Sequence, residues 1–102
     1  MNITGSCRDG RLTLRFSGEL DHHSAREAMI ALSERIDAFL PRECVLNFRD
    51  LTFMDSSGIA LILRAERKMR ELDGKLRVCC VPAQPLRVLD ASGIDRLVSI
   101  TE

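Results

Sequence analysis

A carboxylate and two hydroxyls stand together in Asp55-Ser56-Ser57-Gly58, between an apolar strand and an amphipathic helix. Residues 44–48 alternate as a strand does, and from Gly58 the apolar residues follow helical spacing. In an open α/β sheet, ligands and chemistry collect where a strand gives way to a helix N-terminus, whose free amides favour a phosphate. An exposed serine in this turn could therefore carry a phosphate, next to an Asp55 that would repel it.

The same residues have a plainer interpretation, because Ser and Asp are also the preferred N-caps of helices. Neither Ser56 nor Ser57 has Glu or Gln three positions later, so no capping box explains the pair. A simple cap also leaves unexplained why two hydroxyls and a carboxylate share one turn. Spacing alone leaves both interpretations open.

A second polar turn, Gly18 to His23, leads into an earlier helix. Ser24 and Glu27 fit the S-x-x-E capping box and predict where this helix begins. Asp21 either caps loop amides or contacts a partner. His22 and His23 are adjacent on the turn and have no cysteine nearby, so their spacing does not predict a metal site.

The remaining pattern predicts a single α/β domain over residues 1–102, with a mixed, mainly parallel sheet of four to five strands, an N-terminal antiparallel pair and helices packed on it. Asp9-Gly10 predicts a type I′ hairpin, and Gly74 and Gly93 are expected to follow helix ends. Expected strands are 2–7, 11–16, 44–48, 75–81 and 97–100; expected helices are 25–40, 58–72 and 86–91, the last with Pro85 at its first position. The expected buried stripe of the central helix is Ile59, Ile62, Leu63, Met69 and Leu72.

Composition excludes several classes of function. Fifteen basic and fifteen acidic residues cancel, and the chain has no Trp or Tyr, so neither nucleic acid nor membrane is an expected partner. The first ten residues have no apolar signal region, and no uncharged stretch is long enough to span a bilayer. The four cysteines, with no C-x-x-C spacing, predict reduced and mostly buried thiols in a cytoplasmic protein.

At this point the sequence resembles a known family. F-M-D-S-S-G-I, from Phe53 to Ile59, closely resembles the phosphorylation motif of the STAS-domain anti-sigma factor antagonists. G-E-L-D-H-H, from Gly18 to His23, resembles the same family's first strand-to-helix turn. The likeness runs to about Ile100, and the two motifs lean toward the sporulation branch of the family.

The resemblance implies a regulatory binding protein with no catalytic residues and no cofactor. The unphosphorylated form would bind a cytoplasmic anti-sigma factor that is also a serine kinase, and so release the sigma factor. Phosphorylation at Ser56 would end the complex, and a serine phosphatase would reset it. Ser57 would then be the helix cap, and Gly58 would permit close approach of the partner's backbone. The predicted partner-binding residues are Asp55, Ser57, Gly58, Asp21, His22 and His23.

One departure from the family concerns the C-terminus. Members usually continue into a further helix, whereas this sequence stops at Glu102. Either the sequence is truncated or this version lacks the helix. We expect a monomer, but surface left uncovered there also leaves a dimer open.

Two other functions compete with this one. In the first, the fold is the same, but the protein acts as a phospho-switch or scaffold in a general-stress signalling pathway. The second is a small serine hydrolase using Asp55 and Ser56 with His22 or His23 as base, which lacks the G-x-S-x-G motif.

Overall fold

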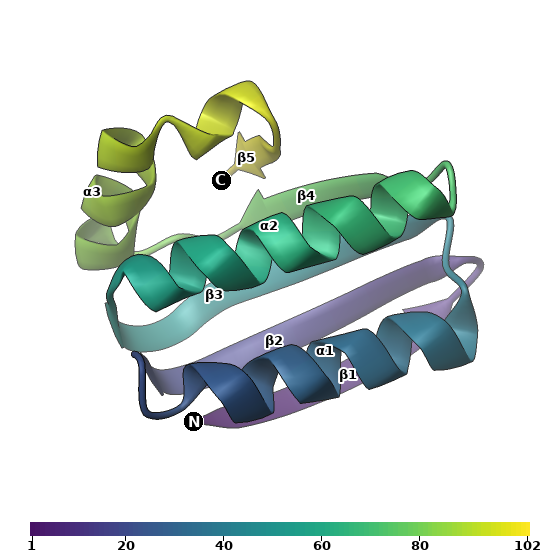
Figure 1. Ribbon diagram of the computed structural model, residues 1–102, viewed down its shortest axis with the longest axis horizontal. Helices are drawn as coiled ribbons and strands as arrows, with labels where there is room; N and C mark the ends of the chain where they lie inside the picture. Colours follow the sequence, from purple (N-terminus) through teal and green to yellow (C-terminus); the bar gives the residue numbers. More distant parts are fainter.

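A five-stranded sheet forms the centre of the structure, a computed structural model that describes residues 1–102. In chain order the elements are β1 (Asn2–Arg8), β2 (Arg11–Leu20), α1 (Ala25–Phe39), β3 (Glu43–Met54), α2 (Ser56–Glu71), β4 (Lys75–Cys79), α3 (Ala83–Ser92), the 3-10 helix η1 (Ile94–Arg96) and β5 (Ser99–Thr101) (Figure 1). The strands lie in the sheet in that same order. β1 and β2 are antiparallel and all other neighbours are parallel, which confirms the predicted fold class.

The first two strands form a hairpin at the edge of the sheet. Asp9 and Gly10 both have positive φ, 53° and 79°, as the predicted type I′ turn requires. β1 has no neighbour on its other side, and most of its residues are exposed.

β2 and β3 are longer than alternation predicts. The expected strands stopped at Phe16 and Phe48, whereas the real ones continue to Leu20 and Met54. Their pairing has register shifts within residues 15–19 of β2, and such irregularities break the two-residue alternation by which strands are recognised. Because of this extension, β2 and β3 end as neighbours.

The core lies between the sheet and the helices. α1 and α2 cover one face of the sheet, and α3 packs near the end of β3 (Figure 1). A single buried cluster joins the sheet to the helices, with Leu46 in β3, Leu32 in α1 and Leu61 in α2 all fully buried. Phe16 and Phe48 meet edge to face at its centre, with ring centroids 5.3 Å apart.

The opposite face of the sheet carries no helix (Figure 1). Residues 44–48 of β3 are therefore covered by helices on one face only. Val45, on the uncovered face, is only 4% exposed, but Asn47 is half-buried.

α1 begins at Ala25 as predicted, but the predicted capping box is wrong. The hydroxyl of Ser24 donates to the carbonyl of Glu19 (2.8 Å) and makes no cap hydrogen bond. Ser24 has helical dihedral angles (φ −97°, ψ −17°), whereas a capping serine is usually extended so that its oxygen can reach the amides of the first turn.

The start and the buried stripe of α2 also differ from expectation. The helix begins at Ser56 and not at Gly58. Leu63 is 42% exposed and Leu72 is 37% exposed, so neither belongs to the core face. The buried residues of α2 are Gly58, Leu61, Ile62, Ala65 and Met69.

Four further boundaries need correction. β5 runs from Ser99 to Thr101, and Leu97 lies outside it because its backbone is helical (φ −107°, ψ −29°) after η1. Asp73, with φ of 54°, and not Gly74, takes the left-handed conformation after α2. β4 ends at Cys79, before Val81, because Cys80 has φ of 60° and leaves the extended conformation. α3 begins at Ala83, so Pro85 lies within its first turn, where a missing amide costs no helical hydrogen bond.

Gly74 is needed for packing. A Cβ atom there would lie 2.6 Å from Cε of Met69 and 2.9 Å from the backbone oxygen of Arg42. Gly93 ends α3 with φ of 72°, as predicted, and the following Ile94 is buried.

All four cysteines are free thiols. Cys44 and Cys79 are buried, whereas Cys7 and Cys80 are partly exposed. Burial raises the pKa of the Cys44 thiol to about 12, so this thiol stays protonated and unreactive at neutral pH. None of the helices is both long and apolar enough to cross a membrane.

A matched pair of leucines on α2 tests the corrected core face. Leu61→Ala is expected to lower the free energy of unfolding by about 2–5 kcal/mol, because this side chain is fully buried. Leu63→Ala should change it by less than about 1 kcal/mol, since surface substitutions have small effects. Urea unfolding measures both variants. Equal losses would contradict the assigned face.

Candidate functional site

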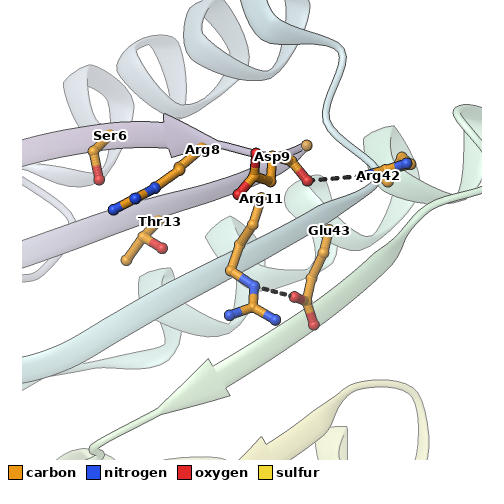
Figure 2. A pocket seen from close by; sticks show the side chains of 8 residues that line it. Ser6, Arg8, Asp9, Arg11, Thr13, Arg42 and Glu43 are labelled. Atoms are coloured by element: carbon orange, nitrogen blue, oxygen red, sulfur yellow. Dashed lines mark hydrogen bonds and ion pairs between the residues drawn. The ribbon is translucent and has the colours of Figure 1, made fainter.

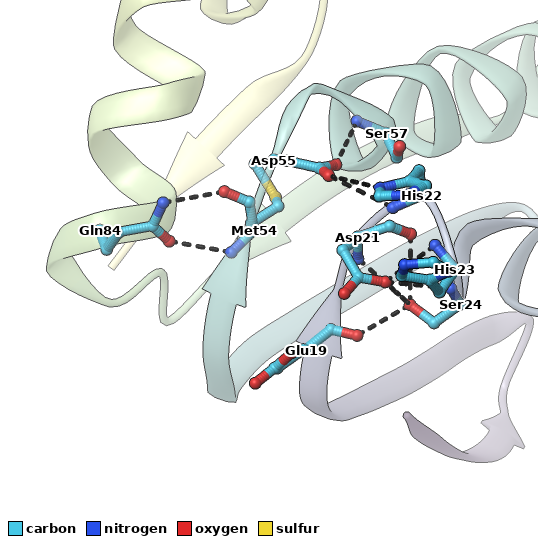
Figure 3. A network of polar contacts seen from close by, with 9 residues as sticks. All are labelled: Glu19, Asp21, His22, His23, Ser24, Met54, Asp55, Ser57 and Gln84. Carbon is cyan, nitrogen blue, oxygen red and sulfur yellow. Dashed lines mark hydrogen bonds and ion pairs between the residues drawn. The ribbon is translucent and has the colours of Figure 1, made fainter.

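Two turns meet at one edge of the sheet. The parallel strands β2 and β3 end together at the pair Leu20–Met54, so the segments that follow them are neighbours. The backbone amide of Asp55 donates to the carbonyl of Leu20 (3.2 Å). The two polar turns recognised separately in the sequence therefore form one site (Figure 3).

Asp55 connects these two turns through its carboxylate (Figure 3). One oxygen accepts a hydrogen bond from the backbone amide of Ser57 (2.7 Å) and so caps α2. The other accepts from the backbone amide of His22 (3.2 Å). A single side chain thereby fixes both the start of the helix and the position of the preceding turn.

These contacts also set the ionisation of Asp55. Partial burial alone would raise the pKa of the carboxyl, but hydrogen bonds from the amides of Ser57 and His22, together with the nearby Ser57 hydroxyl, outweigh it. The pKa of Asp55 is therefore below its usual value, even with the Asp21 charge nearby. The turn is negatively charged at neutral pH.

Asp21 organises the other turn in a similar way. Its Oδ1 atom accepts from the backbone amides of His23 (3.0 Å) and Ser24 (3.1 Å). Burial would raise the pKa of Asp21, but these amides outweigh it and the pKa is lowered. The carboxylate thus caps loop amides, one of its two predicted roles. Its second oxygen makes no hydrogen bond within the chain. That oxygen is therefore free for the other predicted role, contact with a partner.

The two histidines form the outer edge of the site. Their rings lie 4.0 Å apart between centroids, and the His22 side chain is 73% exposed. Nδ1 of His22 is 3.8 Å from a carboxylate oxygen of Asp55, so a protonated His22 would pair with it. No group of three or more His, Cys, Asp or Glu side chains is placed to hold a metal ion.

The cap assigned to Ser57 is wrong, because Asp55 is the N-cap and the two serines are the first two residues of α2. Ser57 is half-buried, and its backbone amide donates to Asp55. Ser56 is exposed, and its hydroxyl makes no hydrogen bond within the chain. The two serines therefore differ in exposure, and Ser56 is the more accessible one.

Gly58 has an internal role that the sequence did not reveal. It is buried, and a Cβ atom at this position would collide with Sδ and Cγ of Met54. The close approach that the glycine permits is therefore to Met54, within the chain. Contact between Gly58 and a partner remains a prediction.

Gln84 is a site residue that sequence analysis missed. Its side-chain amide accepts from the backbone amide of Met54 (2.9 Å) and donates to the carbonyl of Met54 (2.8 Å) (Figure 3). These two bonds join α3 to β3 one residue before Asp55. Residues 82–85 read as a loop between prolines, and nothing in that pattern marks a strand contact.

A shallow groove of about 530 Å³ runs between α2 and α3 beside the free serine. Ser56 lies at it together with apolar side chains that include Ile59 and Val88. Arg87 is the one basic residue among those that line the groove. The site thus combines a free hydroxyl, a partly apolar groove and one cation.

The arrangement does not resemble a hydrolytic triad. Neither histidine is hydrogen-bonded to Ser56 or Ser57, and His22 contacts the carboxylate of Asp55. A serine nucleophile needs a base within hydrogen-bond reach. The geometry offers none to Ser56.

Fold and site together define a small STAS-type domain, with a one-sided mixed sheet and a serine-bearing turn at the start of its central helix. The STAS domain family matches residues 2–102, and the chain belongs to this family. It is 36% identical over 91 residues to the anti-sigma F factor antagonist of Paenibacillus polymyxa, covering 89% of this chain and 78% of that protein. The resemblance found in the sequence is thereby confirmed.

Solved structures agree with this assignment. The anti-sigma factor antagonist SpoIIAA in its unphosphorylated form superposes with a TM-score of 0.83 at 24% identity, over 99% of this chain and 89% of that one. The Bacillus cell fate determinant SpoIIAA in the phosphorylated form superposes with a TM-score of 0.73 at 26% identity, over 99% and 92%.

Removal of the Asp55 carboxylate tests its bridging role. Asp55→Ala is expected to lower the free energy of unfolding at pH 7 by about 1 kcal/mol, because the N-cap is lost. Because folding lowers the pKa of Asp55, the ionised carboxylate stabilises the folded state. This contribution to the free energy of unfolding is fully present above the unfolded pKa of about 3.9 and is lost as pH falls through the folded pKa. The difference between wild type and variant should therefore shrink below about pH 4.

The control is Asp90→Ala, since Asp90 is exposed and its side chain makes no hydrogen bond. Chemical denaturation at several pH values compares the three proteins. A cost for Asp55→Ala that is independent of pH would refute the charged bridge.

Replacement of Gln84 tests the link between α3 and β3. Gln84→Ala leaves the amide and carbonyl of Met54 without these partners and should cost about 1–3 kcal/mol of stability. Hydrogen exchange at the Met54 amide should accelerate. Arg87→Ala, on the same helix, is the control and should leave that exchange rate unchanged. An unaltered Met54 exchange rate in Gln84→Ala would argue against the link.

Proposed function

We propose that this protein is a cytoplasmic anti-sigma factor antagonist controlled by phosphorylation of Ser56. Its unphosphorylated form binds an anti-sigma factor that is also a serine kinase, and the sigma factor is released. The kinase transfers the γ-phosphoryl group of ATP to Oγ of Ser56, with loss of the hydroxyl proton and release of ADP. The modified protein dissociates, and a serine phosphatase restores the hydroxyl by hydrolysis.

One observation carries this proposal: Ser56 is an exposed serine with an unbonded hydroxyl at the first residue of α2. Asp55 performs the capping, so Ser56 can be modified without loss of the helix start. Ser57, by contrast, is half-buried, and its backbone amide donates to Asp55. The proposal also draws on the relatives, which are named anti-sigma F factor antagonist and SpoIIAA.

The groove explains why a phosphate would reverse binding. A partner segment seated between α2 and α3 buries Ile59 and Val88 and meets a neutral hydroxyl at Ser56. A phosphate there adds a charge of about −1.5 to −2 to a turn that already holds two ionised carboxylates, Asp55 and Asp21. Desolvating that charge beside apolar groups is costly, and an acidic partner surface is repelled.

Other residues of the site have subordinate roles in this proposal. Asp21, His22 and His23 form the exposed rim, where the free oxygen of Asp21 can accept from the partner. Asp55 and Ser57 hold the turn in shape. Gly58 is buried and acts by allowing α2 to pack on Met54.

The phosphorylation site is tested by intact mass after incubation with a candidate anti-sigma factor kinase and ATP. Wild type should gain one phosphate, Ser56→Ala none, and the matched control Ser57→Ala one. Size-exclusion chromatography should show that ATP dissolves the wild-type complex and leaves the Ser56→Ala complex intact. A phosphate on Ser56→Ala would move the site, most simply to Ser57.

The kinase that phosphorylates the protein identifies the signalling pathway in which the protein acts. Parallel incubations with a sporulation-type and a general-stress-type anti-sigma factor kinase separate the two pathways, since the fold and serine are common to both. A protein that neither binds nor is phosphorylated by either kinase would contradict the proposal.

A further inference from the structure

The face of the sheet without helices has an ordered arrangement of side chains. Strand register places residues of all the strands in three rows across this face. The first row includes Arg8, Arg11, Glu43 and Lys75. Arg77 stands in the second row and Arg15 in the third. These three rows are called the open face below.

The charge of the open face is strongly one-sided. The whole chain has fifteen basic and fifteen acidic residues, whereas the three rows hold five basic residues and a single acidic one, Glu43. Glu43 pairs with Arg11 and, at 3.9 Å, with Arg77. Arg8, Arg15 and Lys75 have no carboxylate partner and are exposed. The face therefore carries an uncompensated positive charge.

A polar hollow of about 580 Å³ lies at one end of the open face (Figure 2). Arg8, Arg11 and Thr13 line it, and no apolar side chain does. At its rim, a guanidinium nitrogen of Arg42 donates to the carbonyl of Asp9 (2.8 Å). The hollow offers guanidinium and hydroxyl donors to an acceptor group, and Asp9 and Glu43 also line it.

We propose that the open face is a docking surface for an acidic, extended protein segment. Four of its five cations are arginines, whose planar guanidinium pairs with a carboxylate through two hydrogen bonds. Successive rows are about 6.6–6.8 Å apart, twice the rise per residue of a strand. Alternate side chains of an extended segment have the same spacing, so a segment lying along β1 and β2 can bring carboxylates to Arg8 in the first row and to Arg15 in the third.

Other anionic partners fit less well. The three rows contain no aromatic side chain on which the bases of a single-stranded nucleic acid could stack. They also contain no exposed large apolar side chain to anchor in a membrane; Leu97, Leu40 and Phe39, the most exposed ones, all lie elsewhere.

The test measures binding of a fluorescein-labelled Glu-Gly repeat peptide by anisotropy. The double variant Arg8→Glu/Arg15→Glu reverses two unpaired cations of the open face. Arg26→Glu/Arg67→Glu makes the same change in net charge on α1 and α2, where both arginines are exposed and unpaired. The dissociation constant should rise about tenfold or more in the open-face variant and about twofold or less in the control.

Further arms separate the occupants. Wild type should bind the Glu-Gly peptide more tightly than it binds a Gln-Gly peptide, oligothymidylate or phosphatidylglycerol vesicles. Its affinity for the Glu-Gly peptide should fall when salt is raised from about 0.05 M to about 0.15 M. Circular dichroism checks folding, and Arg8→Gln/Arg15→Gln replaces the reversal variant if that one is unfolded. Equal loss in both double variants, or no binding by wild type, overturns the proposal. Tighter binding of oligothymidylate or vesicles than of the Glu-Gly peptide also overturns the proposal. A wild-type dimer that sedimentation detects and that the open-face variant abolishes would overturn it as well.

Discussion

The carboxylate of Asp55 is the contact on which the site depends. One oxygen holds the first turn of α2 through the Ser57 amide, and the other holds the neighbouring turn through the His22 amide. Both contacts require that β2 and β3 end side by side, which the parallel pairing up to Leu20–Met54 provides. The pairing of β2 and β3 up to their ends therefore determines, through the Asp55 carboxylate, where the exposed Ser56 lies.

The support behind this turn is equally specific. The backbone of Met54 donates one hydrogen bond to the Gln84 side chain of α3 and accepts another from it, and the Met54 side chain fills the space that the absent Cβ of Gly58 leaves. A serine placed in this way on a rigid strand end and helix start has a fixed environment. Addition of a phosphate would therefore alter charge more than shape, which suits a switch read by a partner surface.

The one-sided sheet gives the molecule two different faces. The helix-covered face and its adjoining end bear the serine, the groove and the carboxylate-rich turns, whereas the open face bears unpaired arginines. Because the chain is neutral as a whole, this separation is a property of the fold and is invisible in the composition. A partner on one face leaves the other free.

The sequence by itself determined the fold class, the antiparallel hairpin at Asp9-Gly10 and the serine-bearing turn, because alternation, turn residues and the two family motifs are local signals. It misplaced the helix cap and the ends of β2 and β3, since a cap depends on dihedral angles and bulges interrupt alternation. Only the tertiary structure decided that Ser56 is the more exposed serine, that Gln84 holds Met54 and that one face of the sheet is open. Those facts depend on contacts between residues far apart in the chain, such as Gln84 with Met54, 30 positions apart, which no local pattern records.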